Sequence, residues 1–241
     1  MPTIYDGLIK SLSEEYDVGI NRTKTAVMRS FDAVLRNVFK SDYVNVVWDN
    51  NEIDIVIRQK GGEFDLCDRV IKPEQISPSI IARIKKLIRK NMLIQKYDVL
   101  YQNIRTLENT LIKGFLSEKR KDDYVVNYND YPILFLYRKD AQPENEIGLY
   151  KLGQTYLFYV LRAELILNKP LEPSVRIILT RRGGKIPELF IKKETGLDAV
   201  CLLRYPSIKS VVETDGMVPF PVIEKYSKEF HEKLEVKYVR R

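Results

Sequence analysis

The spacing of apolar residues changes from helical to alternating along the first part of the chain. Apolar residues recur every three or four positions in residues 4–16 and again in 27–38, a stripe that predicts two amphipathic helices. Residues 43–48 and 53–57 are rich in β-branched and aromatic residues and are separated by Asp-Asn-Asn, which predicts a hairpin. With a third strand expected over residues 63–70, the pattern indicates a head of two helices and a small sheet.

A long helix is predicted next. Ser77 and Pro78 suit the cap and the first position of a helix, and no glycine or proline follows before Leu107. Apolar residues from Leu93 to Leu107 keep a spacing of four and three, so one face of the helix is expected to be buried. About 30 helical residues extend roughly 45 Å. This length predicts an arm that joins two bodies.

Alternation with a period of two returns after Gly114. Short strands are expected over residues 123–128, 131–137, 156–165 and 175–179, with turn residues between them. Short strands in this arrangement are typical of a small barrel of the OB type.

The last part of the chain predicts a small α/β tail. We expect helices near 187–194 and 222–230, and strands near 199–204, 208–213 and 234–239. The predicted fold class is therefore α+β in a chain of several domains: a helix–hairpin head with a long connecting helix, an OB-like β-barrel and a small α/β tail.

The stretch between the predicted barrel and tail carries the most information. A glycine turn at Gly153 precedes the strand 156–161, and Ile178-Leu179-Thr180-Arg181 is followed by Leu189-Phe190 and Glu194. This order resembles the seam between the S1 domain and the first KH domain in the NusA family of bacterial transcription factors. There, a glycine turn and a hydrophobic strand end an RNA-binding barrel, and an "I-L-S-R-T…L-F…E" element opens the next domain.

Further residues of the predicted barrel agree with this resemblance. Gly114 matches the opening glycine of the S1 domain, and residues 123–126 match its second strand. Leu136-Tyr137-Arg138 stands where the family has "L-P-R", and Pro143-Glu144 matches the loop after it.

Two departures from the family pattern concern the turn and the tail. Gln154 replaces the usual aspartate after the turn glycine. The KH hallmark G-x-x-G, whose backbone clamps RNA, is absent, because Gly216-Met217-Val218-Pro219 has proline in place of the second glycine. The chain therefore resembles a shortened, divergent relative with a degenerate KH-like tail.

The resemblance implies a domain organisation and a function. Residues 1–110 would form a head that binds RNA polymerase, 111–172 an S1/OB-like barrel, and 173–241 a degenerate KH-like domain. The head would dock on the polymerase, while barrel and tail contact the emerging single-stranded RNA. The expected effect is on pausing, termination or antitermination, without catalysis.

Composition and charge agree with a polyanionic partner. The net charge is +7 and the pI about 9.2, and basic residues concentrate in 75–97 and 176–193. The two cysteines, Cys67 and Cys201, lie far apart, as in a reduced intracellular protein. Without a signal pattern or an apolar run of roughly 20 residues, we expect a soluble, cytoplasmic protein that has no membrane, cofactor, metal or small-molecule partner.

Candidate RNA contacts lie on the barrel and at its junction with the tail. OB barrels bind single strands on aromatic platforms, with basic residues along the phosphates; the alternative is that the tyrosines of strands 123–128 and 131–137 fill the barrel. Lysines and arginines near these strands and at the seam complete the candidate site. The residues expected to bind RNA are Lys119, Arg120, Lys121, Tyr137, Arg138, Lys139, Arg181, Arg182 and Lys185.

The basic part of the long helix is assigned to protein contact by the resemblance. Arg83, Lys86 and Lys90 would bind the polymerase, the alternative being a merely solvated helix face. A further possibility is an RNA- or DNA-binding accessory protein that acts without polymerase.

Enzymatic chemistry has one candidate. Glu52-Ile53-Asp54-Ile55 resembles the strand that opens the Mg²⁺ site of many nucleases, but the next strand lacks the E-x-K lysine. The single histidine, His231, excludes a zinc site of the usual ligand spacing. Arg182-Gly183-Gly184-Lys185 lacks the spacing of a phosphate-binding loop.

Overall fold

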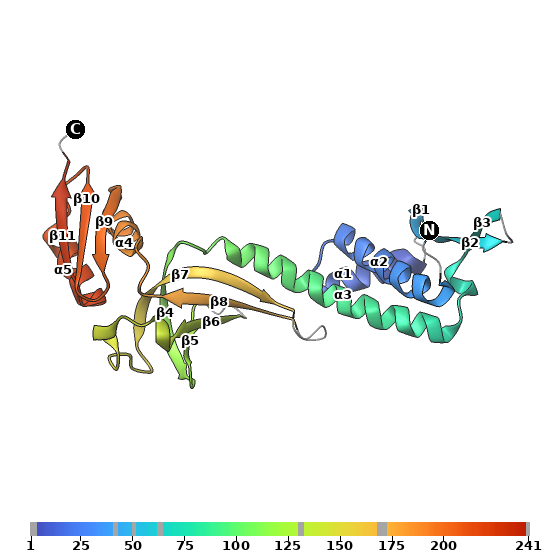
Figure 1. Cartoon of the computed structure of the whole chain (residues 1–241), viewed down its shortest axis with the longest axis horizontal. Helices are drawn as coiled ribbons and strands as arrows, with labels where there is room; N and C mark the ends of the chain where they lie inside the picture. Colours follow the sequence, from blue (N-terminus) through green and yellow to red (C-terminus); the bar gives the residue numbers. More distant parts are fainter. Residues whose placement is uncertain are drawn as a thin grey trace. The chain divides into compact units, whose positions relative to one another are not determined.

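We describe the protein from a computed structural model, which covers residues 4–40, 43–49, 52–61, 65–129, 133–167 and 173–239. The chain divides into two compact units, and each is described by itself (Figure 1). Unit 1 comprises Met1–Leu100 with the short segment Leu167–Pro173, and unit 2 comprises Tyr101–Ile166 with Ser174–Arg241. None of the helices in the described ranges is long and apolar enough to cross a membrane.

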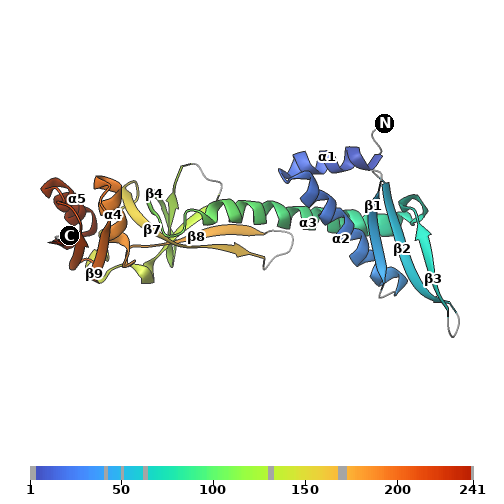
Figure 2. The same cartoon turned by 90° about the horizontal axis from the view of Figure 1, so that it is seen from above.

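Unit 1 contains the predicted helices and the three-stranded sheet. The sheet is antiparallel in the order β1-β2-β3 (Figure 2). Its elements are α1 (Ile4–Tyr16), α2 (Ile20–Phe39), β1 (Val44–Asp49), β2 (Glu52–Gly61), β3 (Asp65–Ile71), the 3₁₀ turn η1 (Pro73–Gln75) and α3 (Pro78–Arg105).

The core of unit 1 lies where the helices meet the sheet. Val27 and Phe31 of α2 pack in one cluster with Ile55 of β2 and Ile84 of α3, all of them buried. The long helix has nearly the predicted extent, and the division between the units falls inside it, after Leu100.

Unit 2 begins with a closed five-stranded barrel, in the order β4-β5-β6-β8-β7. Only β6 and β8 pair in parallel, and the other neighbours are antiparallel. This topology is compatible with an OB-like barrel. The strands are β4 (Leu111–Lys119), β5 (Asp123–Asn127), β6 (Leu134–Arg138), β7 (Thr155–Ile166) and β8 (Ser174–Thr180), and the 3₁₀ turns η2 (Lys139–Ala141) and η3 (Glu144–Glu146) follow β6.

Two details of the barrel bear on the sequence predictions. A Cβ atom at Gly114 would lie 2.2 Å from Cγ1 of Val126, so only glycine allows β4 and β5 to approach this closely. Strand β8 lies beyond the expected domain boundary at residue 172, and the barrel therefore extends to Thr180.

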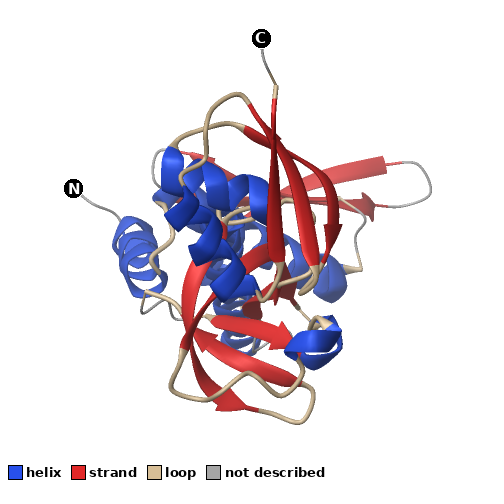
Figure 3. Ribbon diagram, turned by 90° about the vertical axis from the view of Figure 1, so that its left-hand side faces the viewer, coloured by secondary structure: helices blue, strands red, loops and turns tan. Residues whose placement is uncertain are grey.

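The tail of unit 2 is a three-stranded sheet, ordered β11-β10-β9, with two helices on one face (Figure 3). Strand β10 is antiparallel to β9 and parallel to β11. The aromatic rings of Phe190, Tyr226 and Phe230 pack between the helices and the sheet. The elements are α4 (Ile186–Thr195), β9 (Ala199–Tyr205), β10 (Lys209–Thr214), α5 (Phe220–Phe230) and β11 (Lys233–Tyr238), all within a few residues of their predicted positions.

Candidate nucleic-acid interface

The tyrosines and phenylalanine of β5 and β6 fill the barrel. Tyr124, Phe135 and Tyr137 are buried, and Tyr128 packs edge-on against Phe135 at 5.5 Å. Tyr131 lies outside the described residues. Side chains alternate between the two faces of a strand, and on β5 and β6 the aromatic ones point inward. The described outer face of these two strands therefore lacks the expected aromatic platform.

Tyr137 was expected to contact RNA, and its position corrects that expectation. The side chain has 0% exposure, and its hydroxyl lies 2.8 Å from that of Tyr150. Burial raises the pKa of Tyr137, so the phenol stays neutral and serves as a packed, hydrogen-bonded core residue.

The outer face of the barrel has an apolar row across three strands. Val125, Leu136 and Ile178 are paired in register on β5, β6 and β8 and form a cluster of their own. Arg138 follows on β6, while Arg162 lies opposite Ile178 on β7. OB-like barrels use this face of their second and third strands for oligonucleotides. Here the apolar row itself is buried, and the exposed groups beside it are the guanidinium groups of Arg138 and Arg162.

Two arginines of this face share one carboxylate. Arg162 and Arg176 each donate to Glu164 at 2.7 Å. Burial by itself would raise the pKa of Glu164, but the two hydrogen bonds outweigh it, and its pKa lies below the ordinary value. Arg162 and Arg176 were not among the residues expected to bind RNA, although their alternation with the inward residues of β7 and β8 was a usable signal.

We define the basic end of the barrel as the cations around the β4–β5 turn and the end of β6. Arg120 pairs with Glu118 at 2.9 Å, and Arg138 with Asp140 at 2.7 Å. The ammonium of Lys139 donates to the backbone carbonyls of Arg120 and Lys121. The cations are Lys119, Arg120, Lys121, Arg138 and Lys139, and the carboxylates among them are Glu118, Asp122, Asp123 and Asp140.

The structure thus brings together five of the predicted RNA contacts, with four carboxylates between them. Their local charge is nearly balanced, so this end attracts phosphate much less than the number of its cations suggests.

Arg181, another predicted RNA contact, lies in the interface between barrel and tail. Its side chain is 1% exposed. Its Nε donates to Glu146 at 2.8 Å, and its Nη1 donates at 2.8 Å both to the carboxylate of Glu229 and to the carbonyl of Leu157. Its Nη2 donates to the backbone carbonyl of Glu229, and the guanidinium lies 4.7 Å from the centre of the Phe230 ring.

These contacts correct the role expected for Arg181. Burial by itself disfavours the charged guanidinium, but Tyr150 and the carboxylates of Glu146 and Glu229 raise the pKa of Arg181 above its ordinary value. The charged group is fully paired in the interior and reaches no solvent. Arg181 therefore joins β8 and β7 of the barrel to α5 of the tail.

Arg182 and Lys185, the remaining predictions, are exposed at the same seam. The Nη2 of Arg182 donates to the backbone carbonyl of Gln142, which follows η2. Between the two cations, Gly183 lies against the ring of Tyr159, and a Cβ there would be 3.0 Å from the ring.

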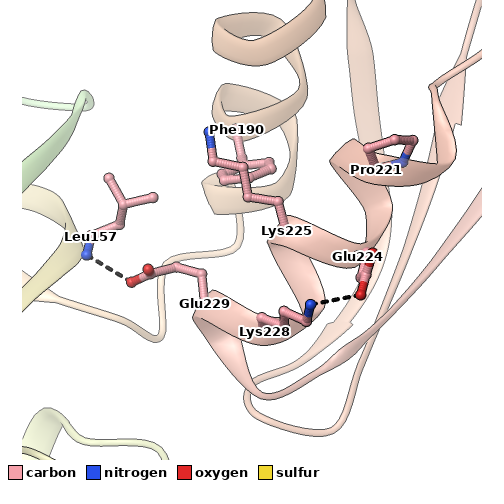
Figure 4. A pocket seen from close by; sticks show the side chains of 7 residues that line it. All are labelled: Leu157, Phe190, Pro221, Glu224, Lys225, Lys228 and Glu229. Carbon is pink, nitrogen blue, oxygen red and sulfur yellow. Dashed lines mark hydrogen bonds and ion pairs between the residues drawn. The ribbon is translucent and has the colours of Figure 1, made fainter.

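A pocket of about 440 Å³ lies beside α5, between the tail helices and the barrel (Figure 4). Its charged groups are already paired: Lys228 with Glu224 at 2.6 Å, and Glu229 with the backbone N–H of Leu157 at 2.8 Å. Lys225 pairs with Glu194 at 2.5 Å. With its polar groups satisfied internally, this pocket offers little for a ligand to recognise.

The predicted polymerase contacts lie on α3 in unit 1. Arg83 and Lys86 are exposed, and Lys90 is half-buried. We call these three, with the exposed Lys85 and Arg89, the basic stripe of α3. Within the described ranges, no member of the stripe forms a salt bridge or a side-chain hydrogen bond.

Of the two carboxylates proposed for a nuclease site, Glu52 and Asp54, only Asp54 has a described side chain. Asp54 pairs with Lys72 at 2.7 Å, and the side chain of Glu52 lies outside the described residues. In the described part of the chain, no three His, Cys, Asp or Glu residues are grouped so that they could hold a metal ion.

No protein-family model and no curated protein matches this chain.

Proposed function

We propose that this protein is a NusA-like transcription factor, which binds RNA polymerase through unit 1 and nascent RNA through unit 2. The observation that carries the proposal is the order of modules: a head with a long helix, a closed OB-like barrel, and an α/β tail joined to that barrel by Arg181. Arg181 stands at the position of the family's "S-R-T" arginine. The same residue therefore matches the family motif and joins the barrel to the tail.

In this proposal, RNA is bound by the outer face of the barrel and by the seam. Arg138, Arg162 and Arg176 would contact phosphates or stack on bases, as guanidinium groups do. Since no aromatic platform lies on β5 and β6, intrinsic affinity is low and depends strongly on salt. Tethering to the polymerase would raise the effective concentration of RNA at the barrel, and this would compensate for the low intrinsic affinity.

The tail contributes without the KH clamp. The chain passes from β10 through Asp215–Pro219 directly into α5, and the sequence has no G-x-x-G there. In the proposed factor, the tail therefore supports the seam and supplies Arg182 and Lys185.

The test uses the full chain with purified bacterial core RNA polymerase. We expect co-elution in gel filtration and a changed lifetime of transcriptional pauses in a purified transcription reaction. Loss of co-elution on changing Arg83, Lys86 and Lys90 to Gln would assign the contact to α3. If the wild-type chain neither co-elutes nor alters pausing, the polymerase function is wrong.

A second candidate is a nucleic-acid-binding accessory protein that acts without polymerase. The unpaired cations of the basic stripe favour it, because they suit phosphate as well as protein carboxylates. RNA binding by the full chain together with failure to bind polymerase would select this alternative.

A further inference from the structure

A second cleft opens where the barrel meets the tail, on the side of Arg182. It measures about 300 Å³ and lies between the loop after β6 and the turn that joins β9 to β10. A hydrogen bond of 3.4 Å from Nδ2 of Asn145 to the carbonyl of Ser207 connects the two walls. The lining residues are Pro143, Glu144, Asn145, Arg182, Tyr205, Pro206, Ser207 and Ile208.

The tail side of this cleft presents an aromatic ring to solvent. Tyr205 is 54% exposed and Ile208 is 61% exposed, in contrast to the tyrosines inside the barrel. Pro143 and Pro206 also line the cleft, so the cleft has apolar surface next to the solvent-exposed ring of Tyr205. A nucleobase stacks on such a surface whatever its identity.

The barrel side presents polar groups. Arg182 is held in place by its bond to the backbone carbonyl of Gln142. The side chain of Gln142 is 4% exposed, and its amide nitrogen has no hydrogen-bond partner in the described part of the chain. Gln142 does not line the cleft, so its buried amide is not among the groups of the site. The exposed ring of Tyr205 and the fixed guanidinium of Arg182, with the carboxylate of Glu144 also on the lining, describe a site for a planar ligand with an adjacent phosphate.

We propose that this cleft binds one base of single-stranded RNA, with Tyr205 stacked on the base and Arg182 at the neighbouring phosphate. A volume of about 300 Å³ is at the lower end of ligand sites and suits a single base rather than a folded element. This inference rests on the proposed RNA binding and gives it a defined subsite.

The buried network beneath the seam positions this subsite. One wall belongs to the barrel and the other to the tail, and Arg181 joins the two through Glu146 and Glu229. A second buried pair, Arg204 with Glu232 at 3.0 Å, fixes the strand that ends at Tyr205. Because both walls are fixed before RNA arrives, binding needs little ordering of the protein.

The experiment measures the binding of fluorescently labelled ten-nucleotide single-stranded RNA to the full chain by anisotropy. Three variants are compared: Tyr205→Ala, Tyr205→Phe and, as a matched control, Tyr238→Ala. Tyr238 lies on β11 of the same sheet and is 52% exposed. Circular dichroism checks that each variant is folded.

We expect Tyr205→Ala to weaken binding by roughly 5- to 150-fold, the range measured for the loss of one stacked base. Tyr205→Phe should keep most of the affinity because its ring remains, and Tyr238→Ala should bind as the wild type does. Ultraviolet cross-linking followed by mass spectrometry should place RNA on the peptide that contains Tyr205.

Two results would overturn the subsite in different ways. If the wild type binds RNA but Tyr205→Ala and Tyr238→Ala bind equally well, the cleft is not the site while the proposed RNA binding stands. If the wild-type chain binds no RNA even at low salt, both the cleft and the RNA-binding half of the proposed function are wrong.

Discussion

The basic stripe of α3 and the basic end of the barrel contain the same residue types but balance their charge differently. The five cations of the basic stripe have no ion-pair partner among the described residues, whereas those of the barrel end are interleaved with carboxylates, as Arg120 with Glu118 and Arg138 with Asp140. Arg181, buried in the seam, is fully paired. The difference teaches that the number of lysines and arginines in a segment does not measure its attraction for an anion; their pairing and burial do.

Replacing the buried cation should have the largest effect. Arg181→Met leaves the carboxylates of Glu146 and Glu229 without their cation, and removing one member of a buried pair costs about 3–5 kcal/mol of unfolding free energy. Arg182 is the exposed residue next to Arg181, and Arg182→Met should change the free energy of unfolding by only about 0.5 kcal/mol. Hydrogen exchange of β8 and α5 reports on unit 2.

Unit 1 supplies an internal control for this prediction. The only tryptophan of the chain, Trp48, lies in β1, so its fluorescence in urea follows unit 1 and should not respond to Arg181→Met. Equal destabilisation by the two arginine variants would contradict the structural role of Arg181.

Neutralising the cations of the two proposed binding surfaces should have the next largest effect. Changing Arg138, Arg182 and Lys185 to Gln should reduce the slope of log affinity for RNA against log salt by about 2, since each phosphate contact to a single strand contributes about 0.7. Changing Arg83, Lys86 and Lys90 to Gln should instead weaken polymerase binding by roughly tenfold, as expected for several rim charges. If both triple variants lose RNA equally, the binding is diffuse and has no site.

Removing one carboxylate should strengthen RNA binding modestly. Glu164 holds both Arg162 and Arg176, so Glu164→Gln leaves two guanidinium groups free for phosphate on the outer face. We expect RNA affinity to rise about two- to fivefold at low salt, an effect of the size of one exposed ion pair. Glu194→Gln, which frees Lys225 on α5, is the matched control and should leave the affinity unchanged; a weaker complex with Glu164→Gln would argue against RNA on this face.

The smallest expected effect concerns pH. Hydrogen bonds from Lys209 and Lys233, at 2.7 and 2.8 Å, lower the pKa of Glu235 from 4.5 to about 2. A carboxylate with a lowered folded-state pKa stabilises the fold above its unfolded pKa and loses that contribution as the pH falls through the folded value. The difference in urea midpoint between wild type and Glu235→Gln should therefore be constant above about pH 4.5 and vanish towards pH 2. A difference that grows on acidification would have the wrong sign.

The sequence by itself determined most elements of this protein. The helical spacing in α1, α2 and α3 and the alternation in the tail strands predicted elements that the structure contains, because local periodicity records which side of each element is buried. The barrel followed from short strands and turn residues, and Gly114 marks a contact that only glycine allows. Arg182 and Lys185 are exposed at the seam, while their binding to RNA stays a prediction.

Only the tertiary structure decided which side of each strand is the inside and which cations are free. Alternation shows that Tyr124 and Val125 face opposite ways, but not which of them faces the barrel interior. Arg181 looks like any exposed arginine in sequence, because its partners Glu146 and Glu229 lie 35 and 48 positions away. Tyr205 likewise becomes a candidate only when the loop after β6 is folded beside it. Burial and ion pairing depend on contacts between distant segments, and these contacts form only when barrel and tail have closed on each other.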